Sequence, residues 1–173
     1  MTRRVLLQSS LAAVAAESPD SFTREIARRV FLRINQLRAG SAVGELAWSA
    51  ALAKCATEQS LRKNLLRFPG HDDPERGGVS DRLKAAGIPW LRCGENIFSE
   101  RGYADPVHFA AVHWWYSPGH RENLLNPEFK QTGVGVAKGS DETFFVTQIF
   151  LLRIPADPEV SSAQSPPSRH RGK

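Results

Sequence analysis

An α+β domain is predicted, because helical patterns fill most of the chain and strand-like runs end it. Apolar residues recur every three to five positions between 22 and 37, as in an amphipathic helix. Two β-prone runs, 132–137 and 143–152, flank a turn-forming segment. The 173 residues, 41% of them hydrophobic, suffice for one domain with a core. Because helices precede strands, we expect helices layered on a sheet.

The first half of the chain predicts two long helices, over 21–40 and from about 49 to 65. Ser49 is a suitable cap for the second helix, because its hydroxyl can accept a bond from the first turn. Segment 68–74 contains two prolines and a glycine, which cannot continue the helical ladder. His71 is therefore expected in a loop directly after a helix.

The second half predicts shorter elements. They are, in order, a helix over 80–86, an element beginning at 94–98, a helix over 107–116, a helix from 118 to about 125, and an antiparallel hairpin of 132–137 and 143–152. Pro106 suits the first turn of its helix. Ser117 is the expected cap of the next helix, with Pro118 at the first helical position.

Both ends of the chain differ in composition from the domain predicted over 20–155. Residues 1–16 carry Arg3-Arg4, a weakly apolar run and a small-x-small pattern, and are predicted to be an export signal of the twin-arginine type. The alternative is the frayed start of a cytosolic protein. The run is too short and too polar for a transmembrane anchor. Residues 156–173 are rich in Pro, Ser and basic residues, which predicts a disordered tail.

The net charge of +5 does not predict nucleic-acid binding. Five positive charges lie in the terminal segments, and the remaining 18 basic residues compare with 18 acidic residues in the chain as a whole, three of which (Glu17, Asp157 and Glu159) lie outside 20–155. Without a cluster of Lys and Arg, the domain lacks the footprint that binds phosphate backbones.

Cys55 and Cys93 are the only cysteines, which excludes a disulfide-rich scaffold and a Cys-rich metal site. In an exported protein the two could pair, and closing that loop would stabilise the fold by about 3 to 4 kcal/mol. Two buried thiols are the equal alternative.

Three segments carry a family resemblance: Gly70-His71, Gly94-Glu95-Asn96-Ile97, and 114–123, which ends in Ser-Pro-Gly-His-Arg-Glu-Asn. With Phe129 and a Gly-Val-Gly-Val run, their order and spacing resemble the bacterial SCP-domain branch of the CAP (SCP/PR-1-like) family over roughly residues 22–152. The resemblance implies a three-layer α-β-α sandwich with a small, mostly antiparallel central sheet.

The resemblance also implies a cleft. Family members commonly gather two histidines and two glutamates, and the motifs match these to His71, Glu95 and His120. The second glutamate has no match, because Ser117 stands in its place; Glu122 or His113 could replace it in space.

The residue types in this cleft suit zinc or another divalent metal. Two neutral imidazoles and a carboxylate are zinc ligands, and three protein ligands leave one position open. His120, near a helix N-terminus, is expected to resist protonation. The alternative is that His120 and Glu95 bond each other and nearby backbone, with a purely structural role.

Three functions follow from these observations. The first is an exported binding module, periplasmic or extracellular, with a metal-binding cleft and an unknown ligand; the resemblance implies a lipid or another protein. The second is a metal-dependent hydrolase or peptidase in which Glu95 is the catalytic base. The third is a purely structural interaction domain.

Overall fold

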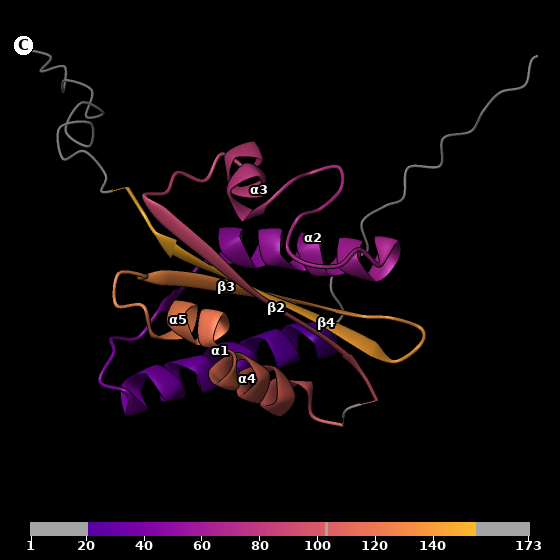
Figure 1. The fold of residues 1–173 in the computed structure, drawn as a ribbon, viewed down its shortest axis with the longest axis horizontal. Coiled ribbons are helices and arrows are strands. Elements are labelled where there is room, and N and C mark those ends of the chain that lie inside the picture. The colour runs from indigo at the N-terminus through magenta and orange to yellow at the C-terminus, as the bar shows by residue number, and fades with distance from the viewer. Residues whose placement is uncertain (1–20, 103, 155–173) are drawn as a thin grey trace, which may run out of the picture.

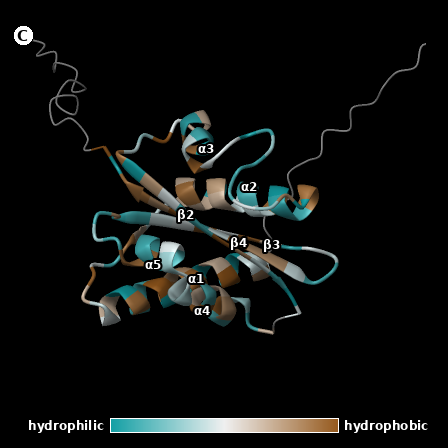
Figure 2. Ribbon diagram, viewed as in Figure 1, coloured by the Kyte–Doolittle hydropathy of each residue, from teal (hydrophilic) through white to brown (hydrophobic). Residues whose placement is uncertain are grey.

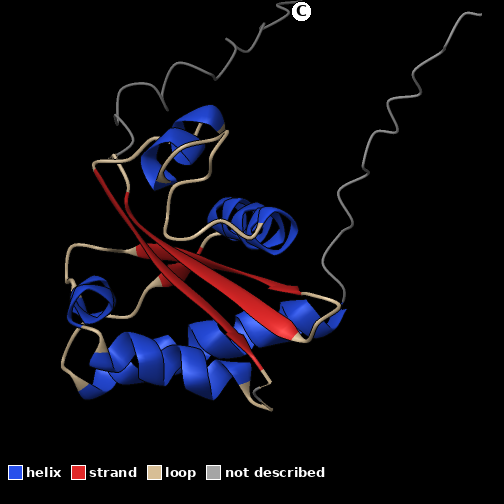
Figure 3. Cartoon of the chain, turned by 45° about the vertical axis from the view of Figure 1, so that its right-hand side comes forward, coloured by secondary structure: helices blue, strands red, loops and turns tan. Residues whose placement is uncertain are grey.

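A four-stranded sheet divides the helices into two layers, as Figures 1 and 3 show. The computed structural model describes residues 21–102 and 104–154. Over these residues the elements are, in chain order, α1 (Ser21–Gly40), β1 (Ala47–Trp48), α2 (Ala50–Leu66), α3 (Val79–Ala85), β2 (Arg92–Arg101), α4 (Pro106–Tyr116), α5 (Pro118–Leu125), β3 (Gln131–Lys138) and β4 (Thr143–Leu152). Helices α2 and α3 cover one face of the sheet, and α1, α4 and α5 cover the other.

The sheet is mostly antiparallel, in the order β1-β3-β4-β2. Strands β3 and β4 form the predicted hairpin, and β2 pairs antiparallel with the far side of β4. Only the two-residue β1 runs parallel to its neighbour, β3. The prediction of an α+β, three-layer sandwich is therefore confirmed.

Strand β4 lies between two hydrophobic cores. Successive side chains of a strand point to opposite faces, so Phe150 packs with Ile34 and Trp114 beneath α1 and α4, whereas Ile149 packs with Leu52 beneath α2. This double burial explains why apolar residues stand at consecutive positions of β4, on either side of the buried polar pair Thr147 and Gln148, instead of alternating with polar ones. Figure 2 shows that α1, which covers one of these cores, carries both hydrophobic and hydrophilic residues.

Most element boundaries agree with the sequence predictions. Ser49 caps α2 through a 3.4 Å bond from Leu52 N–H, as expected. Helix α3 starts and ends one residue earlier than predicted. The prediction for Ser117 was only half right: it occupies the cap position of α5, but its side chain makes no capping bond. Strand β1 was not predicted, because two residues are too few to give a pattern.

Cys55 on α2 and Cys93 on β2 are both free thiols in the structure. Both contribute to the smaller core beneath α2 and α3. Burial raises the pKa of each thiol, which keeps both protonated and unreactive near neutral pH.

Within residues 21–102 and 104–154, no helix has the length and apolar character needed to cross a membrane. The predicted export signal over 1–16 and the predicted tail over 156–173 lie outside these described residues.

Two glycines of β3 let α2 approach the sheet closely. A Cβ atom on Gly133 would lie 2.1 Å from the backbone nitrogen of Ala53, and one on Gly135 would lie 2.0 Å from that of Thr57. Backbone atoms cannot move aside as a flexible side chain can, so the close packing of α2 on β3 has room only for glycine at both positions.

Replacing Gly135 with alanine is expected to lower the free energy of unfolding by about 3 kcal/mol or more, because α2 must move off the sheet. Chemical denaturation measures this change. Gly119→Ala is the matched control, since a Cβ there meets nothing within 4 Å. An equal loss in the two variants would show that close packing is not the reason for glycine at position 135.

Candidate functional site

Strand β2 carries the candidate site along the edge of the sheet. Glu95 and Asn96 are adjacent and both buried, so their side chains point to opposite faces. Glu95 faces α3 and the loop after α2, whereas Asn96 faces α5. The site therefore joins both helical layers around one strand.

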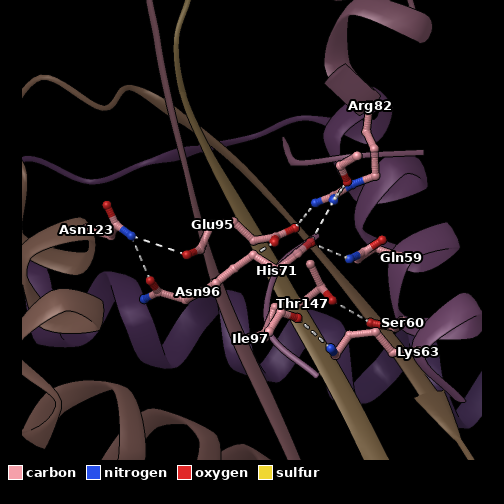
Figure 4. A network of polar contacts seen from close by, with 12 residues as sticks. Gln59, Ser60, Lys63, His71, Arg82, Glu95, Asn96, Ile97, Asn123 and Thr147 are labelled. Carbon is pink, nitrogen blue, oxygen red and sulfur yellow. Dashed lines mark hydrogen bonds and ion pairs between the residues drawn. The ribbon is translucent and has the colours of Figure 1, made fainter. Parts of the chain in front are cut away.

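Glu95 is held by two partners, as Figure 4 shows. Arg82 of α3 donates to Oε2 within a buried ion pair, and Nδ1 of His71 lies 2.9 Å from Oε1. An ionised carboxylate only accepts hydrogen bonds, so Nδ1 of His71 carries the proton. In a neutral ring this leaves the Nε2 lone pair free, on a side chain that is 45% exposed.

The backbone of His71 is fixed as well. Its carbonyl accepts bonds from Nη1 of Arg82 and Nε2 of Gln59, each at 3.1 Å. Arg82 also donates to the Gly77 carbonyl at 2.9 Å, which ties α3 to the loop that carries His71. Arg82 was not among the residues predicted for the site; the signal that points to it is Glu95 itself, because a buried glutamate requires a cationic partner.

On the other face of β2, asparagines join the two most specific sequence motifs. Asn96 donates to the backbone carbonyl of His120 at 3.0 Å. Asn123 donates to the side-chain oxygen of Asn96 at 2.9 Å and to the Glu95 carbonyl at 3.3 Å. These bonds place the first turn of α5 against β2, which explains the asparagine in each motif.

Three histidines lie around the edge of β2. The ring centroids of His71 and His120 are 6.4 Å apart, and those of His113 and His120 are 5.5 Å apart. Nδ1 of His120 is buried and has no hydrogen-bond partner among the described residues. Burial, followed by the nearby His113 and His71, lowers the pKa of His120. The expected resistance to protonation is confirmed in direction, and desolvation is its main cause.

The structure thus brings His71 close to both Glu95 and His120, and places His113 beside His120. Glu122 is exposed on α5. The alternative in which Glu95 and His120 bond each other does not describe this structure, because the carboxylate oxygens of Glu95 bond His71 and Arg82. Across the described ranges 21–102 and 104–154, no three His, Cys, Asp or Glu side chains are arranged to hold a metal ion.

The loop that carries His71 is anchored by Asp73. Both carboxylate oxygens of this buried residue accept bonds from Arg62 of α2, one of them at 2.8 Å. The same carboxylate accepts from the backbone N–H groups of Glu75 and Arg76. Because of these bonds, with Arg62 contributing most, the pKa of Asp73 falls to about 2.

The Asp73 anchor predicts an acid-sensitive contribution to stability. A carboxylate whose folded pKa lies below its unfolded value near 3.9 stabilises the fold above pH 4, and this contribution of about 2 kcal/mol is lost as pH falls from 4 to 2. Asp73→Asn should therefore reduce the free energy of unfolding at pH 7 and flatten its dependence on pH between 4 and 2. Urea denaturation across this pH range measures both, with the exposed neighbour in Asp72→Asn as control. An unchanged acid limb in Asp73→Asn would contradict this account.

Comparison with known proteins adds three findings. The model of the CAP (cysteine-rich secretory protein) family matches residues 31–150. YkwD of Bacillus subtilis (strain 168) is 37% identical over 90 residues, which are 51% of this chain and 34% of YkwD. An extracellular SCP-domain protein from Bacillus anthracis str. Ames is structurally similar, with a TM-score of 0.67 and 31% identity over 76% of this chain and 41% of that one. The chain thus matches less than half the length of either relative.

A more distant structure, NaASP2 solved with Zn2+, has a TM-score of 0.55 and 19% identity over 78% of this chain and 84% of that chain. At this identity the similarity concerns the fold.

Proposed function

The chain belongs to the CAP (cysteine-rich secretory protein) family. We propose that it is an exported binding module whose cleft takes a divalent metal ion. The SCP-domain relative from Bacillus anthracis is extracellular, which supports a place outside the cytoplasm. The predicted twin-arginine signal agrees with this location. The observation that carries the metal proposal is the unpartnered, buried Nδ1 of His120 beside His71.

His71 and His120 are the residues that would hold the ion. A metal-binding histidine usually donates its other N–H to a carboxylate, which fixes the ring and raises its basicity. His71 already has this arrangement with Glu95. His120 has a lowered pKa, so its ring is neutral at pH 7 and has a lone pair to offer. His113 lies close enough to His120 to supply a third imidazole after a side-chain rotation.

Glu95 acts in this proposal as a positioning residue. Its side chain is 2% exposed, and Arg82 and His71 occupy both oxygens. The positive charge of Arg82 would also repel a metal ion that approached the carboxylate of Glu95. A zinc ion held by the imidazoles of His71 and His120 would act there as a Lewis acid toward an anionic or carbonyl group of a ligand. NaASP2, a protein of the same fold, was solved with Zn2+.

The same geometry counts against hydrolysis with Glu95 as catalytic base. A base must reach the proton that it removes, within about 3 Å or through one water. A carboxylate with both oxygens bonded inside the protein must first give up the Arg82 ion pair, which is costly when both charges are buried. We therefore favour binding over catalysis.

Calorimetric titration of zinc chloride into the folded protein is expected to show one saturable site. His71→Ala and His120→Ala should each abolish it. Glu95→Gln should weaken it by about 10- to 100-fold, because a neutral amide is a weaker acceptor for Nδ1–H of His71 and leaves Arg82 without its counter-charge. Circular dichroism of each variant checks that it is folded.

His108→Ala is the matched control, since His108 is an exposed histidine of α4 whose ring packs on Phe109. Loss of binding in this variant would indicate non-specific surface histidines. No saturable binding by the folded wild type would overturn the metal proposal. Variants that lose stability but keep zinc affinity would instead support a structural interaction domain.

The proposed export has a separate test. Replacement of Arg3 and Arg4 by lysines keeps the charge but changes the arginine pair that defines the signal. In a bacterial host the full chain is expected outside the cytoplasm, and the double-lysine variant inside it, by fractionation and immunoblotting. Equal export of both chains would contradict a twin-arginine signal.

A further inference from the structure

A buried lysine of α2 lies against the loop that carries His71. Lys63 is 4% exposed, and its Nζ donates to the carbonyl of Phe68 at 3.0 Å and to that of Gly70 at 2.7 Å. The same atom lies 4.4 Å from the centre of the Phe68 ring. Within the part of the chain that the structure describes, no carboxylate pairs directly with this charge; Glu95 and Asp73 act on it only at longer range.

The position of this charge points to the loop as its purpose. Burial of an ammonium group is costly, and lysine is rarely buried without a paired carboxylate. An apolar side chain of similar length would fill the same space on α2 without that cost. Because both hydrogen-bond acceptors of Lys63 are backbone carbonyls directly before His71, the charge stabilises the conformation in which this loop presents its histidine.

Gly70 connects Lys63 to His71. It has a left-handed backbone, with φ of 65°, although a Cβ atom there would meet nothing within 4 Å. The backbone angle, and not a lack of space, therefore favours glycine. In this conformation the Gly70 carbonyl accepts the bond from Lys63. Since the peptide group that joins Gly70 to His71 is planar, a fixed oxygen also fixes the direction in which the chain enters His71.

Gln59 fixes the peptide group on the other side of His71. It lies one helical turn before Lys63 on α2, and its Nε2 donates to the His71 carbonyl at 3.1 Å. Figure 4 shows Gln59 and Lys63 together beside His71. With both neighbouring peptide groups held, the ring of His71 is placed 2.9 Å from Oε1 of Glu95.

We propose that Lys63 and Gln59 are positioning residues for the metal cleft, because they hold the two peptide groups that flank His71 and so keep its ring bonded to Glu95. This inference rests on the proposed function, in which His71 binds the metal ion. A loop histidine without these bonds would sample other orientations, and the cost of ordering it would be subtracted from the binding free energy of the metal.

Lys63→Met removes the ammonium group and keeps a long, unbranched side chain. We expect this variant to bind zinc about tenfold or more weakly, which is the size typical of lost support for a metal ligand. Lys63→Arg retains donors at the end of a long side chain and should recover most of the affinity. Lys54→Met is the matched control, because Lys54 is an exposed lysine of the same helix, and it should bind as the wild type does. Calorimetric titration of zinc chloride into the full chain measures all four proteins.

A second readout needs no metal. Heteronuclear NMR of the imidazole groups, at a pH where the rings are neutral, reports which ring nitrogen carries the proton. His71 of the wild type should show one tautomer, protonated at Nδ1, as its bond to Glu95 requires. Lys63→Met and Gln59→Leu should each give a mixture of tautomers at His71, while the signals of His108 stay unchanged.

The outcomes separate the positioning role from the metal site. Folded Lys63→Met and Gln59→Leu with wild-type zinc affinity, or with the wild-type tautomer at His71, would overturn the proposal and leave both residues a structural role alone. If the wild type binds no zinc but both variants mix the tautomers, the proposed metal function fails and the positioning of His71 stands. Circular dichroism checks folding, and Gln59→Leu, which keeps the Lys63 charge, decides the matter if Lys63→Met does not fold.

Discussion

The alternation of side chains along β2 is the constraint on which the candidate site depends. Because neighbouring residues of a strand face opposite ways, Glu95 reaches the layer of α2 and α3 while Asn96 reaches α5. One edge strand thus holds a loop histidine on one face and a helix histidine on the other, close enough for their rings to lie 6.4 Å apart. A shift in register by one residue would exchange these faces and separate the cleft from both supports.

The ion pair between Glu95 and Arg82 gives the cleft its chemical character. The buried Arg82 neutralises the charge of Glu95, so the side chains of the cleft that remain available to a ligand are the imidazoles of the histidines. Arg82 also holds the carbonyl of His71, which couples the orientation of that ring to its backbone position. The arrangement favours a fixed binding site over one in which a carboxylate exchanges protons.

The two edges of the sheet have different surroundings. On β2, asparagine and glutamate side chains connect the strand to both helical layers. On β3, glycines replace side chains so that α2 lies directly on the strand, and the short β1 leaves most of the far edge without a strand partner. The first edge fixes the histidine cleft. The second edge is covered by α1 and α2, which bury Val134 and Val136 almost completely.

The helices, the hairpin and the histidine motifs could be predicted from the sequence, because periodicity, caps and prolines act over a few neighbouring residues. His71 in a loop and Ser49 as a cap are examples. The sequence did not reveal β1 or the choice of Arg82 as the partner of Glu95, and it named both His113 and Glu122 as candidates for the cleft, of which His113 lies beside His120. These depend on contacts between segments far apart in the chain, which no local pattern encodes. They are visible in the folded chain alone, since burial sets which charges must pair and packing sets which rings meet.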